Sequence, residues 1–407
     1  MSTTYQGRPS DLPLFDFLLG ELKPKGKLLT PFNIISVPVM LVGAVLIAIR
    51  FIYGLGSVTN LNQEFPWGFW VSFDVITGVA FAGGAYLVTF AVYVMGKEKY
   101  HPIVRATVLN GFLAYLFYAI ALTLDLGRPW NIVNPIIGNS FGYNSILFLV
   151  AWHFMLYMAS EFIEFSPAIA EWLNLKKAQR VLTGLTLVTV IFGVTLSCLH
   201  QSGVGALFLL AKSKIHPLWY SEFIPVLFLV SSVASGASVI ILEGSISHRV
   251  FRGQLGKDKH GSFDQIVLGL GRGAAVALFL YFFLKVMAFV HGHHWDYIFT
   301  GWGQWYMVEM LGFVVLPCAL FAAAYKQQDV RLAQVAAVLT LIGIVLNRLN
   351  ISLIAFNWNT DATYFPSVYE FIVTFSILFA EIWAFRWVVH RLPVLREGPD
   401  WSHKGSH

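Results

Sequence analysis

Long apolar stretches alternate with short polar segments along the whole chain. A helix needs about 20 residues to cross the hydrocarbon core of a bilayer, and ten stretches reach or approach that length. They lie near residues 34–53, 70–95, 105–124, 144–162, 181–199, 223–243, 266–290, 304–324, 332–349 and 368–389. The pattern therefore predicts an all-α integral membrane protein with about ten transmembrane helices.

The same pattern divides the chain into three parts. Residues 1–33 form a polar, partly amphipathic lead-in without the long apolar run and small-residue cleavage site of a signal peptide. Residues 34–390 are predicted to form one membrane domain, and residues 391–407 a polar tail. The ninth apolar stretch is the shortest, so its boundaries are the least certain of the ten.

The composition agrees with a polytopic membrane protein. Of the 407 residues, 57% are hydrophobic and only 12% are charged, about half the charged fraction of a soluble domain. The mean hydropathy is +0.67. No basic run resembles a nucleic-acid-binding arm, and the net charge of +5 is modest, so we expect no nucleic-acid partner.

The basic residues predict how the helices are oriented. With both termini on the cytoplasmic side, nineteen lysines and arginines fall in the inner segments and only Arg128, Lys212 and Lys214 in the outer loops. The inner set is Arg8, Lys23, Lys25, Lys27, Lys97, Lys99, Arg105, Lys176, Lys177, Arg180, Arg249, Arg252, Lys257, Lys259, Lys326, Arg331, Arg391, Arg396 and Lys404. This positive-inside asymmetry predicts cytoplasmic termini and an even number of helices.

The five loops on the opposite side are rich in Trp, Phe, Tyr, Asn, Gly and Pro. They lie near residues 54–69, 125–143, 200–222, 291–303 and 350–367. An aromatic belt is ordinary at a membrane interface. Five such loops with almost no lysine also suggest a docking surface for a partner protein.

Small residues favour close helix packing at two places, 78–86 (GVAFAGGAY) and 231–238 (SSVASGAS). Helices two to five and six to nine are predicted to form two four-helix bundles of the same orientation, with the first and last helices flanking them.

Several ionisable side chains lie inside the apolar stretches near the outer side, where an unpaired charge is costly. Asp74 follows FPWGFWVSF in the second helix, Asp125 and Arg128 close the third, and His200 and Gln201 close the fifth. A quinone head group needs hydrogen-bond donors and two protons per two-electron reduction, so we predict Asp74 and His200 as its acid/base groups.

Each of these residues also has a structural explanation. Asp74 could accept hydrogen bonds from backbone or tryptophan N–H groups, and His200 could be an ordinary interfacial histidine. Asp125 and Arg128 could form an ion pair that fixes the helix end.

A deeper set of ionisable groups suggests a proton path from the cytoplasmic side. His153 and Glu161 lie on the fourth helix, Glu243 at the end of the sixth and Glu381 in the tenth. The alternative is that these carboxylates are solvated helix-end groups beside basic loops. The remaining charges in the later helices are interpreted as structural pairs: Arg272, Lys285, Glu309, Arg348 and Glu370.

Cysteine and histidine spacing argues against a metal centre in this chain. Cys198 and Cys318 are isolated, so they cannot ligate an iron–sulfur cluster. A transmembrane haem b needs two histidines at matching depth, and only His153 is predicted to be deep. The run HGHHWD (291–296) is weak evidence for a metal site. We predict neither haem nor cluster.

Seven segments carry a family resemblance that extends from about residue 34 to residue 395. They are YGLGSVTNLNQEFPWGFWVSFD (53–74), EKYHPIVR (98–105), LDLGRPWN (124–131), LHQSGVGAL (199–207), KIHPLWYSE (214–222), IILEGS (240–245) and SLIAFN (352–357). These segments resemble the NrfD, or polysulfide reductase membrane-subunit, family, and in particular the HybB-type membrane subunit of NiFe hydrogenases.

The resemblance implies a haem-free, quinone-reactive subunit of the bacterial inner membrane. It implies a periplasmic iron–sulfur partner with hydrogenase subunits, or in relatives a multihaem cytochrome or polysulfide-type complex, and menaquinone as the electron acceptor. The residues that match the family's quinone pocket are Asp74, Asp125, Arg128, His200 and Gln201. We predict that Trp67, in the PWG step before Asp74, also binds the quinone. The lead-in at 11–27 is longer than the resemblance leads us to expect.

Two other functions remain open. A secondary transporter would have discontinuous helices, repeats and charges near the midplane, whereas these candidates lie near one face. A purely structural anchor would need no titratable group at Asp74 or His200.

Overall fold

The computed structural model describes residues 7–25, 28–138, 142–251 and 259–395. Within these ranges the chain is helical and contains no named strand, and ten helical segments are long and apolar enough to span a membrane. The predicted all-α membrane fold with ten spans is thus confirmed. The spans are Pro31–Tyr53, Gly68–Val94, Glu98–Asp125, Ile146–Trp172, Lys176–Ala211, Ile224–Val250, Phe263–His291, Gly301–Gln327, Val330–Ile354 and Val368–Arg391.

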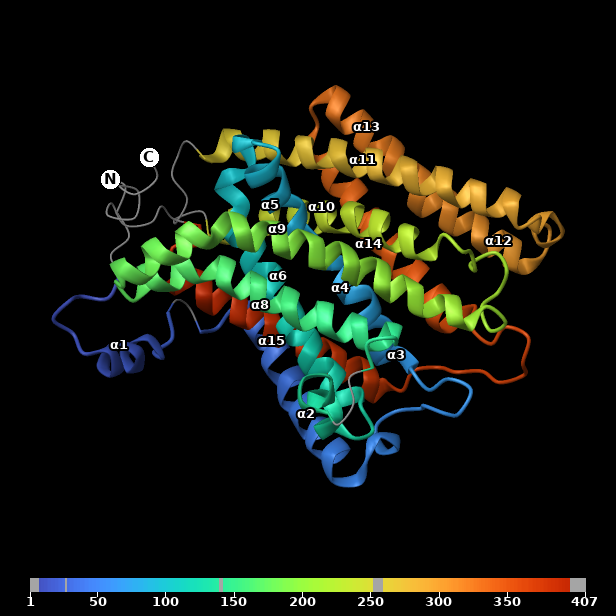
Figure 1. The fold of residues 1–407 in the computed structure, drawn as a ribbon, viewed down its shortest axis with the longest axis horizontal. Helices are drawn as coiled ribbons and strands as arrows, with labels where there is room; N and C mark the ends of the chain where they lie inside the picture. Colours follow the sequence, from blue (N-terminus) through green and yellow to red (C-terminus); the bar gives the residue numbers. More distant parts are fainter. Residues whose placement is uncertain (1–6, 26–27, 139–141, 252–258, 396–407) are drawn as a thin grey trace.

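The spans correspond to the helices labelled in Figure 1. A short helix precedes them, two spans are interrupted, and one short helix lies in a loop. The helices are α1 (Leu14–Glu21), α2 (Pro31–Tyr53), α3 (Gly68–Trp70), α4 (Gly78–Phe81), α5 (Gly84–Thr89), α6 (Val104–Asp125), α7 (Asn134–Ile137), α8 (Ile146–Trp172), α9 (Lys176–Leu207), α10 (Ile224–Val250), α11 (Lys259–His291), α12 (Gly301–Met307), α13 (Leu316–Gln327), α14 (Val330–Leu349) and α15 (Val368–Arg391).

Wider, π-helical turns occur in three of the described spans. One turn, Val71–Thr77, separates α3 from α4, and another, Val308–Val315, separates α12 from α13. Two more, Phe90–Val94 and Asn350–Ile354, end the second and the ninth span. Such turns displace side chains from the regular helical register and are frequent at functional sites.

The helices form two bundles and a flanking pair. The second span (α3 to α5) packs with α6, α8 and α9, and α10 packs with α11, α13 and α14. The helices α2 and α15 contact each other, and α15 also packs on α6. The predicted two four-helix bundles with two flanking helices are therefore present.

Small residues join the two bundles, as predicted. A Cβ built on Gly236 of α10 would lie 2.2 Å from the backbone nitrogen of Gly84, so the backbones of α10 and α5 are in direct contact. Beside them the Tyr86 hydroxyl and the Ser232 hydroxyl are 2.8 Å apart. The close approach needs glycine at both positions.

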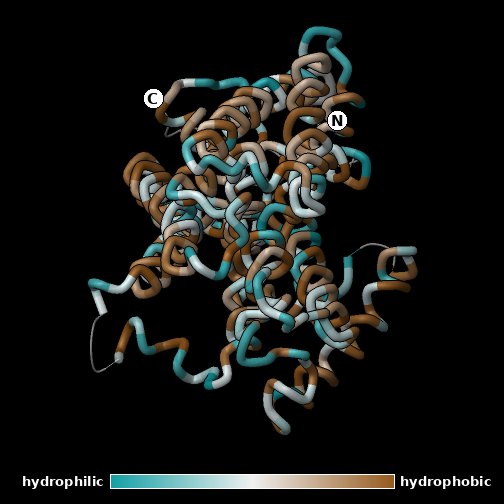
Figure 2. The backbone as a smooth tube through the Cα atoms, turned by 90° about the vertical axis from the view of Figure 1, so that its right-hand side faces the viewer, coloured by the Kyte–Doolittle hydropathy of each residue, from teal (hydrophilic) through white to brown (hydrophobic). Residues whose placement is uncertain are grey.

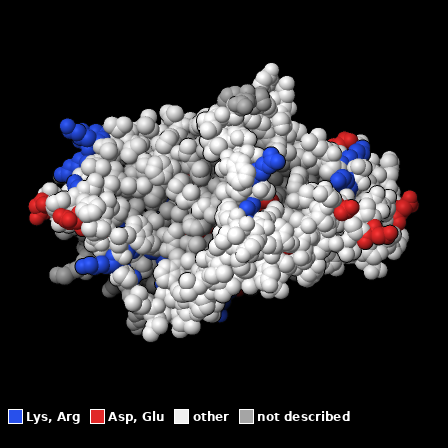
Figure 3. Space-filling view, turned by 90° about the horizontal axis from the view of Figure 1, so that it is seen from below, with Lys and Arg blue, Asp and Glu red and all other residues white. Residues whose placement is uncertain are grey.

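Charge and polarity are distributed as a membrane requires. Seen along the helices, the helix walls are apolar and the hydrophilic residues concentrate in connecting segments (Figure 2). Figure 3 shows Lys, Arg, Asp and Glu gathered at the two ends, with a broad, nearly uncharged band between them. The helix α1 and the C-terminal end of α15 lie at the same end of the molecule (Figure 1). Among the basic residues used to predict orientation, Lys27, Arg252, Lys257, Arg396 and Lys404 lie outside the described residues, as does the tail beyond 395.

Candidate quinone site

The second span begins at a turn that requires glycine. Gly68 has φ +51°, and a Cβ at this position would lie 2.3 Å from Cδ2 of Leu61. The turn brings the Phe69 N–H to the hydroxyl of Tyr364, which accepts it at 3.0 Å. Trp67, just before the turn, is 37% exposed, and its ring meets that of Phe208 edge-on at 5.8 Å. Trp67 therefore lies between the start of the second span and the end of α9.

Asp74 lies in the π-helical turn and is 4% exposed. Its Oδ2 accepts a hydrogen bond of 3.1 Å from the Thr374 hydroxyl of α15. The carboxyl therefore faces the flanking helix at the edge of the first bundle. A single hydroxyl leaves most of the hydrogen-bonding capacity of a carboxylate unused, so the site can accept a ligand or water.

Asp125, the last residue of α6, is paired differently from the sequence-based expectation. Its charge interacts with the guanidinium of Arg50 in α2, and Arg128 is exposed. Arg50 is 4% exposed, and it donates to the carbonyls of Leu124 (2.6 Å) and Leu126 at the end of α6. Oδ1 of Asp125 is buried without a hydrogen-bond partner among the described residues. Arg50 was not predicted as a site residue.

His200 and Gln201 are both 1% exposed and sit inside the first bundle. Nδ1 of His200 is 3.1 Å from the carbonyl oxygen of Val150, so this nitrogen carries the proton, and Nε2 is buried without a partner. Gln201 donates from Nε2 to the carbonyl of Val79 at 2.6 Å. Val79 is five residues beyond Asp74, about 7 Å along the helix axis. Asp74 and the His200–Gln201 pair thus lie at nearby levels.

Two tyrosines of α6 stand between these groups. Tyr118 packs against Gly78, where a Cβ would lie 2.5 Å from its ring, and it interacts electrostatically with Asp74. Tyr115, one turn earlier, has its ring centroid 5.7 Å from that of His200. Asp74 and His200 themselves share no hydrogen bond in the part of the chain that the structure describes. Asp74 thus faces α15, whereas His200 contacts α6 and α8.

The interior of the first bundle continues as a line of buried polar groups on α8. Glu161 is 1% exposed, and both its carboxyl oxygens lack a hydrogen-bond partner among the described residues. The Tyr157 hydroxyl and His153 Nδ1 also lack one, and His153 interacts electrostatically with His200. Gly111 of α6 provides room for the carboxyl, since a Cβ there would lie 2.4 Å from Oε1. His153 is thus near His200, and Glu161 lies about two helical turns further along α8. Buried orphan groups of this kind are the usual sites of internal water.

Glu243 belongs to a different part of the interior. It lines a cavity of about 50 Å³ between α6, α10 and α11, together with Thr107, Ser247 and Leu395. Its charge interacts with that of Glu381 on α15. Glu381 in turn interacts electrostatically with Tyr118, which also interacts with Asp74. Among the described residues, Glu243 is therefore linked to Asp74 and not to His153 or Glu161.

The outer loops of the second bundle enclose a histidine that was not singled out as a site residue. His216 is 0% exposed, and its ring lies 4.6 Å from Trp358 and 5.1 Å from both Trp302 and Tyr297, measured between centroids. Burial, together with the charge of the neighbouring His294, lowers the pKa of His216 to about 4. His216 is therefore neutral near pH 7.

Metal ligands are not grouped in the described residues: no cluster of three or more His, Cys, Asp or Glu side chains could hold a metal ion. Cys198 and Cys318 are free and half-buried. In the HGHHWD run, His293 precedes a short 3₁₀-helix, His294–Tyr297, in which the rings of His294 and Tyr297 are in contact.

The sequence matches the family model described as polysulphide reductase, NrfD, over residues 57–356. A protein of Nitratidesulfovibrio vulgaris (strain Hildenborough) is 43% identical over 382 residues, which is 93% of this chain and 98% of its own length. The probable Ni/Fe-hydrogenase 2 b-type cytochrome subunit of Escherichia coli K12 is 32% identical over 89% of this chain and 93% of its own. The menaquinone reductase integral membrane subunit of N. vulgaris is 26% identical over 72% and 74%. The chain therefore belongs to the NrfD family of membrane subunits.

Proposed function

We propose that this chain is the quinone-reactive membrane subunit of a respiratory oxidoreductase in the bacterial inner membrane. It takes electrons at its outer face from a partner iron–sulfur subunit and delivers them to menaquinone. The observation that carries the proposal is that Asp74 and His200 are buried, incompletely hydrogen-bonded and at nearby levels, each beside a tyrosine of α6. The names of two relatives, a menaquinone reductase subunit and a hydrogenase subunit, support it.

The two electrons come from the partner, and residues of this chain transfer the two protons to the quinone. Reduction of a quinone to a quinol takes two electrons and two protons, one at each carbonyl oxygen. Asp74 supplies one proton, and it is oriented by the Thr374 hydroxyl. His200 supplies the other from Nε2, after this nitrogen has taken up a proton from the interior path, because the Nδ1 proton is held by the carbonyl of Val150. Gln201 is a further hydrogen-bond donor to the head group. Trp67 borders the entrance of the quinone site. Asp125 and Arg128 line the outer rim of this entrance, and the charge of Asp125 interacts with that of Arg50.

The proton supply runs through the interior of the first bundle. His153 and Glu161, with Tyr157 between them, extend from His200 along α8. Glu243 and Glu381 serve the Asp74 flank from the cavity beside α10. Both termini are cytoplasmic in this proposal, so protons taken from that side make quinone reduction electrogenic.

A hydrogenase is the donor that we favour, because the E. coli relative that the chain matches along 93% of its length is named as a hydrogenase subunit. A multihaem cytochrome or polysulfide-type complex would use the same quinone site with another donor. A purely structural anchor, or a secondary transporter, would use neither Asp74 nor His200 for proton transfer.

The test uses the chain purified with its partners from mildly solubilised membranes. Co-purifying subunits and extracted quinones are identified, and donor-driven reduction of a menaquinone analogue is measured. Asp74→Asn keeps the size and the Thr374 contact but cannot carry a proton, so turnover should fall roughly 100-fold or more. His200→Gln should do the same. Asp16→Asn, the same change at an exposed residue of α1 outside the predicted docking loops, is the control. Unchanged turnover of Asp74→Asn in an intact complex would reduce the chain to an anchor.

A test for haem accompanies the turnover measurements, because the E. coli relative is named as a b-type cytochrome subunit. In this chain the ring of His200 is packed between Tyr115 and Phe154, at 5.7 and 5.5 Å, and its Nδ1 is bonded to Val150. With these partners around the ring of His200, we expect no haem between His153 and His200. The reduced-minus-oxidised spectrum of the purified chain should show no haem b band.

A further inference from the structure

The N-terminal helix α1 is attached to the body of the protein by one side only. At the end of α8, the ring of Phe17 packs on Trp172 with centroids 5.4 Å apart. Just before α1, the N–H of Arg8 donates to the carbonyl of Trp172 at 2.8 Å, and Asn174 donates to the carbonyl of Arg8 at 3.2 Å. The lead-in is thus tied to the end of the helix that carries His153 and Glu161.

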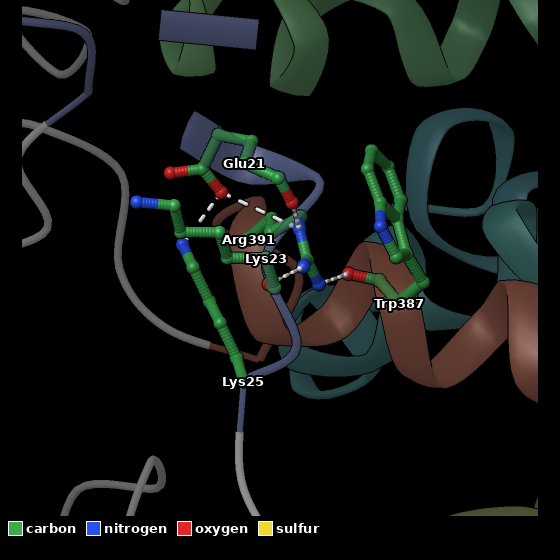
Figure 4. Close-up of polar contacts among 5 residues, drawn as sticks. All are labelled: Glu21, Lys23, Lys25, Trp387 and Arg391. Carbon is green, nitrogen blue, oxygen red and sulfur yellow. Dashed lines mark hydrogen bonds and ion pairs between the residues drawn. The ribbon is translucent and has the colours of Figure 1, made fainter. Parts of the chain in front are cut away.

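A second attachment ties the other end of α1 to α15. The guanidinium of Arg391, 5% exposed, donates to the carbonyls of Glu21 (2.7 Å), Lys23 (2.8 Å) and Trp387 (3.2 Å). The carboxylate of Glu21 lies 3.4 Å from the same guanidinium and 2.5 Å from the ammonium of Lys25 (Figure 4). A buried arginine that is saturated by backbone carbonyls fixes the position of the lead-in. The helix therefore bridges the ends of α8 and α15.

The other side of α1 is apolar and uncovered. Phe15, Leu19 and Leu22 are 71%, 48% and 67% exposed. Their spacing of i, i+4 and i+7 places them in one stripe, and Phe17 and Glu21, which contact the body, lie on a different side of the helix. A soluble surface would rarely leave three large apolar side chains in a row uncovered.

The exposed stripe continues into the lipid-facing surface of the first span. Leu28 and Leu29 are 64% and 84% exposed, and α2 begins two residues later at Pro31. On α2 itself, Ile34 and Ile35 are each 61% exposed at the start of a span that is mostly uncovered by protein. Lipid covers α2, so the same leaflet lies next to α1.

We propose that α1 is an interfacial helix that inserts Phe15, Leu19 and Leu22 into the headgroup–acyl boundary of the adjacent lipid leaflet. The lead-in carries acidic residues as well as lysines, so insertion depends on the apolar stripe and does not require anionic lipid. Because the opposite side holds Trp172 and Arg391, the bound leaflet fixes the ends of α8 and α15 at a constant depth.

The test measures the depth of single positions by nitroxide labelling of the full chain in phosphatidylcholine vesicles. Cys198 and Cys318 are first replaced by alanine, and single cysteines are then introduced as F15C, L19C and D16C. Asp16 is exposed and about 100° around the helix from Phe15, so it is the matched control. At positions 15 and 19 the collision rate with oxygen should exceed that with a water-soluble nickel chelate several-fold, and at position 16 the order should reverse.

Two results would overturn the proposal. Labels at 15 and 19 that are as accessible to the nickel chelate as the label at 16 would mean that the stripe stays in water. Low accessibility to both probes would mean that protein covers it, either a second copy or a soluble partner. Adding phosphatidylglycerol should leave the depth unchanged, and insertion only in its presence would contradict the apolar mechanism.

Discussion

Both four-helix bundles bury carboxylates, but the hydrogen bonding of these carboxylates differs between the two bundles. In the second bundle, Glu309 accepts hydrogen bonds from Trp219 Nε1 (2.7 Å), Asn347 Nδ2 (2.7 Å) and Asn350 Nδ2 (2.5 Å). In the first bundle, Glu161 is equally buried and has no hydrogen-bond partner among the described residues for either oxygen. Two buried acids in one membrane domain thus have very different surroundings.

The difference separates a structural carboxylate from one available for chemistry. A buried group with all its hydrogen bonds made has no capacity left for a proton carrier or a ligand, and it stabilises one packing arrangement. A buried group without partners is costly unless water or a substrate completes its bonds. The second bundle therefore acts as a scaffold, and the proposed proton chemistry belongs to the first.

The largest expected effect is on stability, at Glu309. Glu309→Ala leaves three buried donors without an acceptor, which should lower the free energy of unfolding by about 3–5 kcal/mol. Tryptophan fluorescence during thermal unfolding in detergent measures the change. Glu222→Ala, at an exposed glutamate, should stay within about 0.5 kcal/mol. If both variants melt alike, Glu309 is not the structural centre of the second bundle.

Glu161 should show the reverse behaviour. Glu161→Gln keeps the shape of the side chain but cannot carry a proton, so quinone-reductase turnover should fall about 10-fold or more, with little change in melting temperature. Glu98→Gln, an exposed glutamate at the same end of the molecule, should leave turnover unchanged. A variant that unfolds more easily but turns over normally would place Glu161 in the structural class with Glu309.

The sequence predicted the spans and individual buried polar residues, but it did not predict which residues these polar groups interact with. Hydropathy alone located all ten helices, and FPWGFWVSFD pointed to Asp74 because a carboxylate in an apolar run is conspicuous. The electrostatic interaction of Asp125 in α6 with Arg50 in α2 follows from packing that no local pattern encodes. The same is true of the hydrogen bond from Arg50 to the carbonyl of Leu124. Tyr115 and Tyr118 carried no signal, because tyrosines in a membrane helix look like ordinary aromatic residues.

The separation of Asp74 from His200 could not be foreseen for a related reason. Asp74 lies near the start of its span, as predicted, but the prediction that His200 closes the fifth helix is wrong, because α9 continues to Leu207. In both cases the position along the helix does not say which neighbour a side chain faces. The π-helical turn at Val71–Thr77 shifts the helical register, and Asp74 then meets Thr374 of α15. A regular 3.6-residue repeat does not predict that rotation.

A smaller effect is expected at Gly111, which tests whether the space beside Glu161 matters. Gly111→Ala places a methyl group 2.4 Å from Oε1 of Glu161 and 2.6 Å from Cβ of Ala85, which should cost roughly 1–3 kcal/mol. Gly273→Ala on α11 meets nothing within 4 Å and should be neutral or slightly stabilising. Adding Glu161→Ser to Gly111→Ala should restore part of the loss. If it restores none, the clash is with Ala85 and not with the carboxyl.

The smallest effect concerns His216. This residue challenges the comparison because it is buried beside the second bundle and one of its two ring nitrogens lacks a hydrogen-bond partner among the described residues. Nδ1 accepts a hydrogen bond from the Leu218 N–H at 3.2 Å, and Nε2 has no partner among the described residues. Burial lowers its pKa to about 4, below the value of about 6.5 for an unfolded chain. The unfolded state therefore binds the proton first, and the stability that neutral His216 contributes is complete above about pH 6.5 and declines as the pH falls towards 4.

His216→Asn stays neutral at every pH and keeps an acceptor for the Leu218 N–H. The difference in melting temperature between pH 7 and pH 4.5 should therefore be smaller in this variant than in the parent chain, whereas His293→Asn, at an exposed histidine, should behave like the parent. Turnover at pH 7 should not change, because a neutral ring enclosed by Trp302 and Trp358 holds the outer loops together and takes no part in proton transfer. A loss of turnover at neutral pH without a loss of stability would extend the chemically active region into the second bundle, and the division of labour between the two bundles would then be wrong.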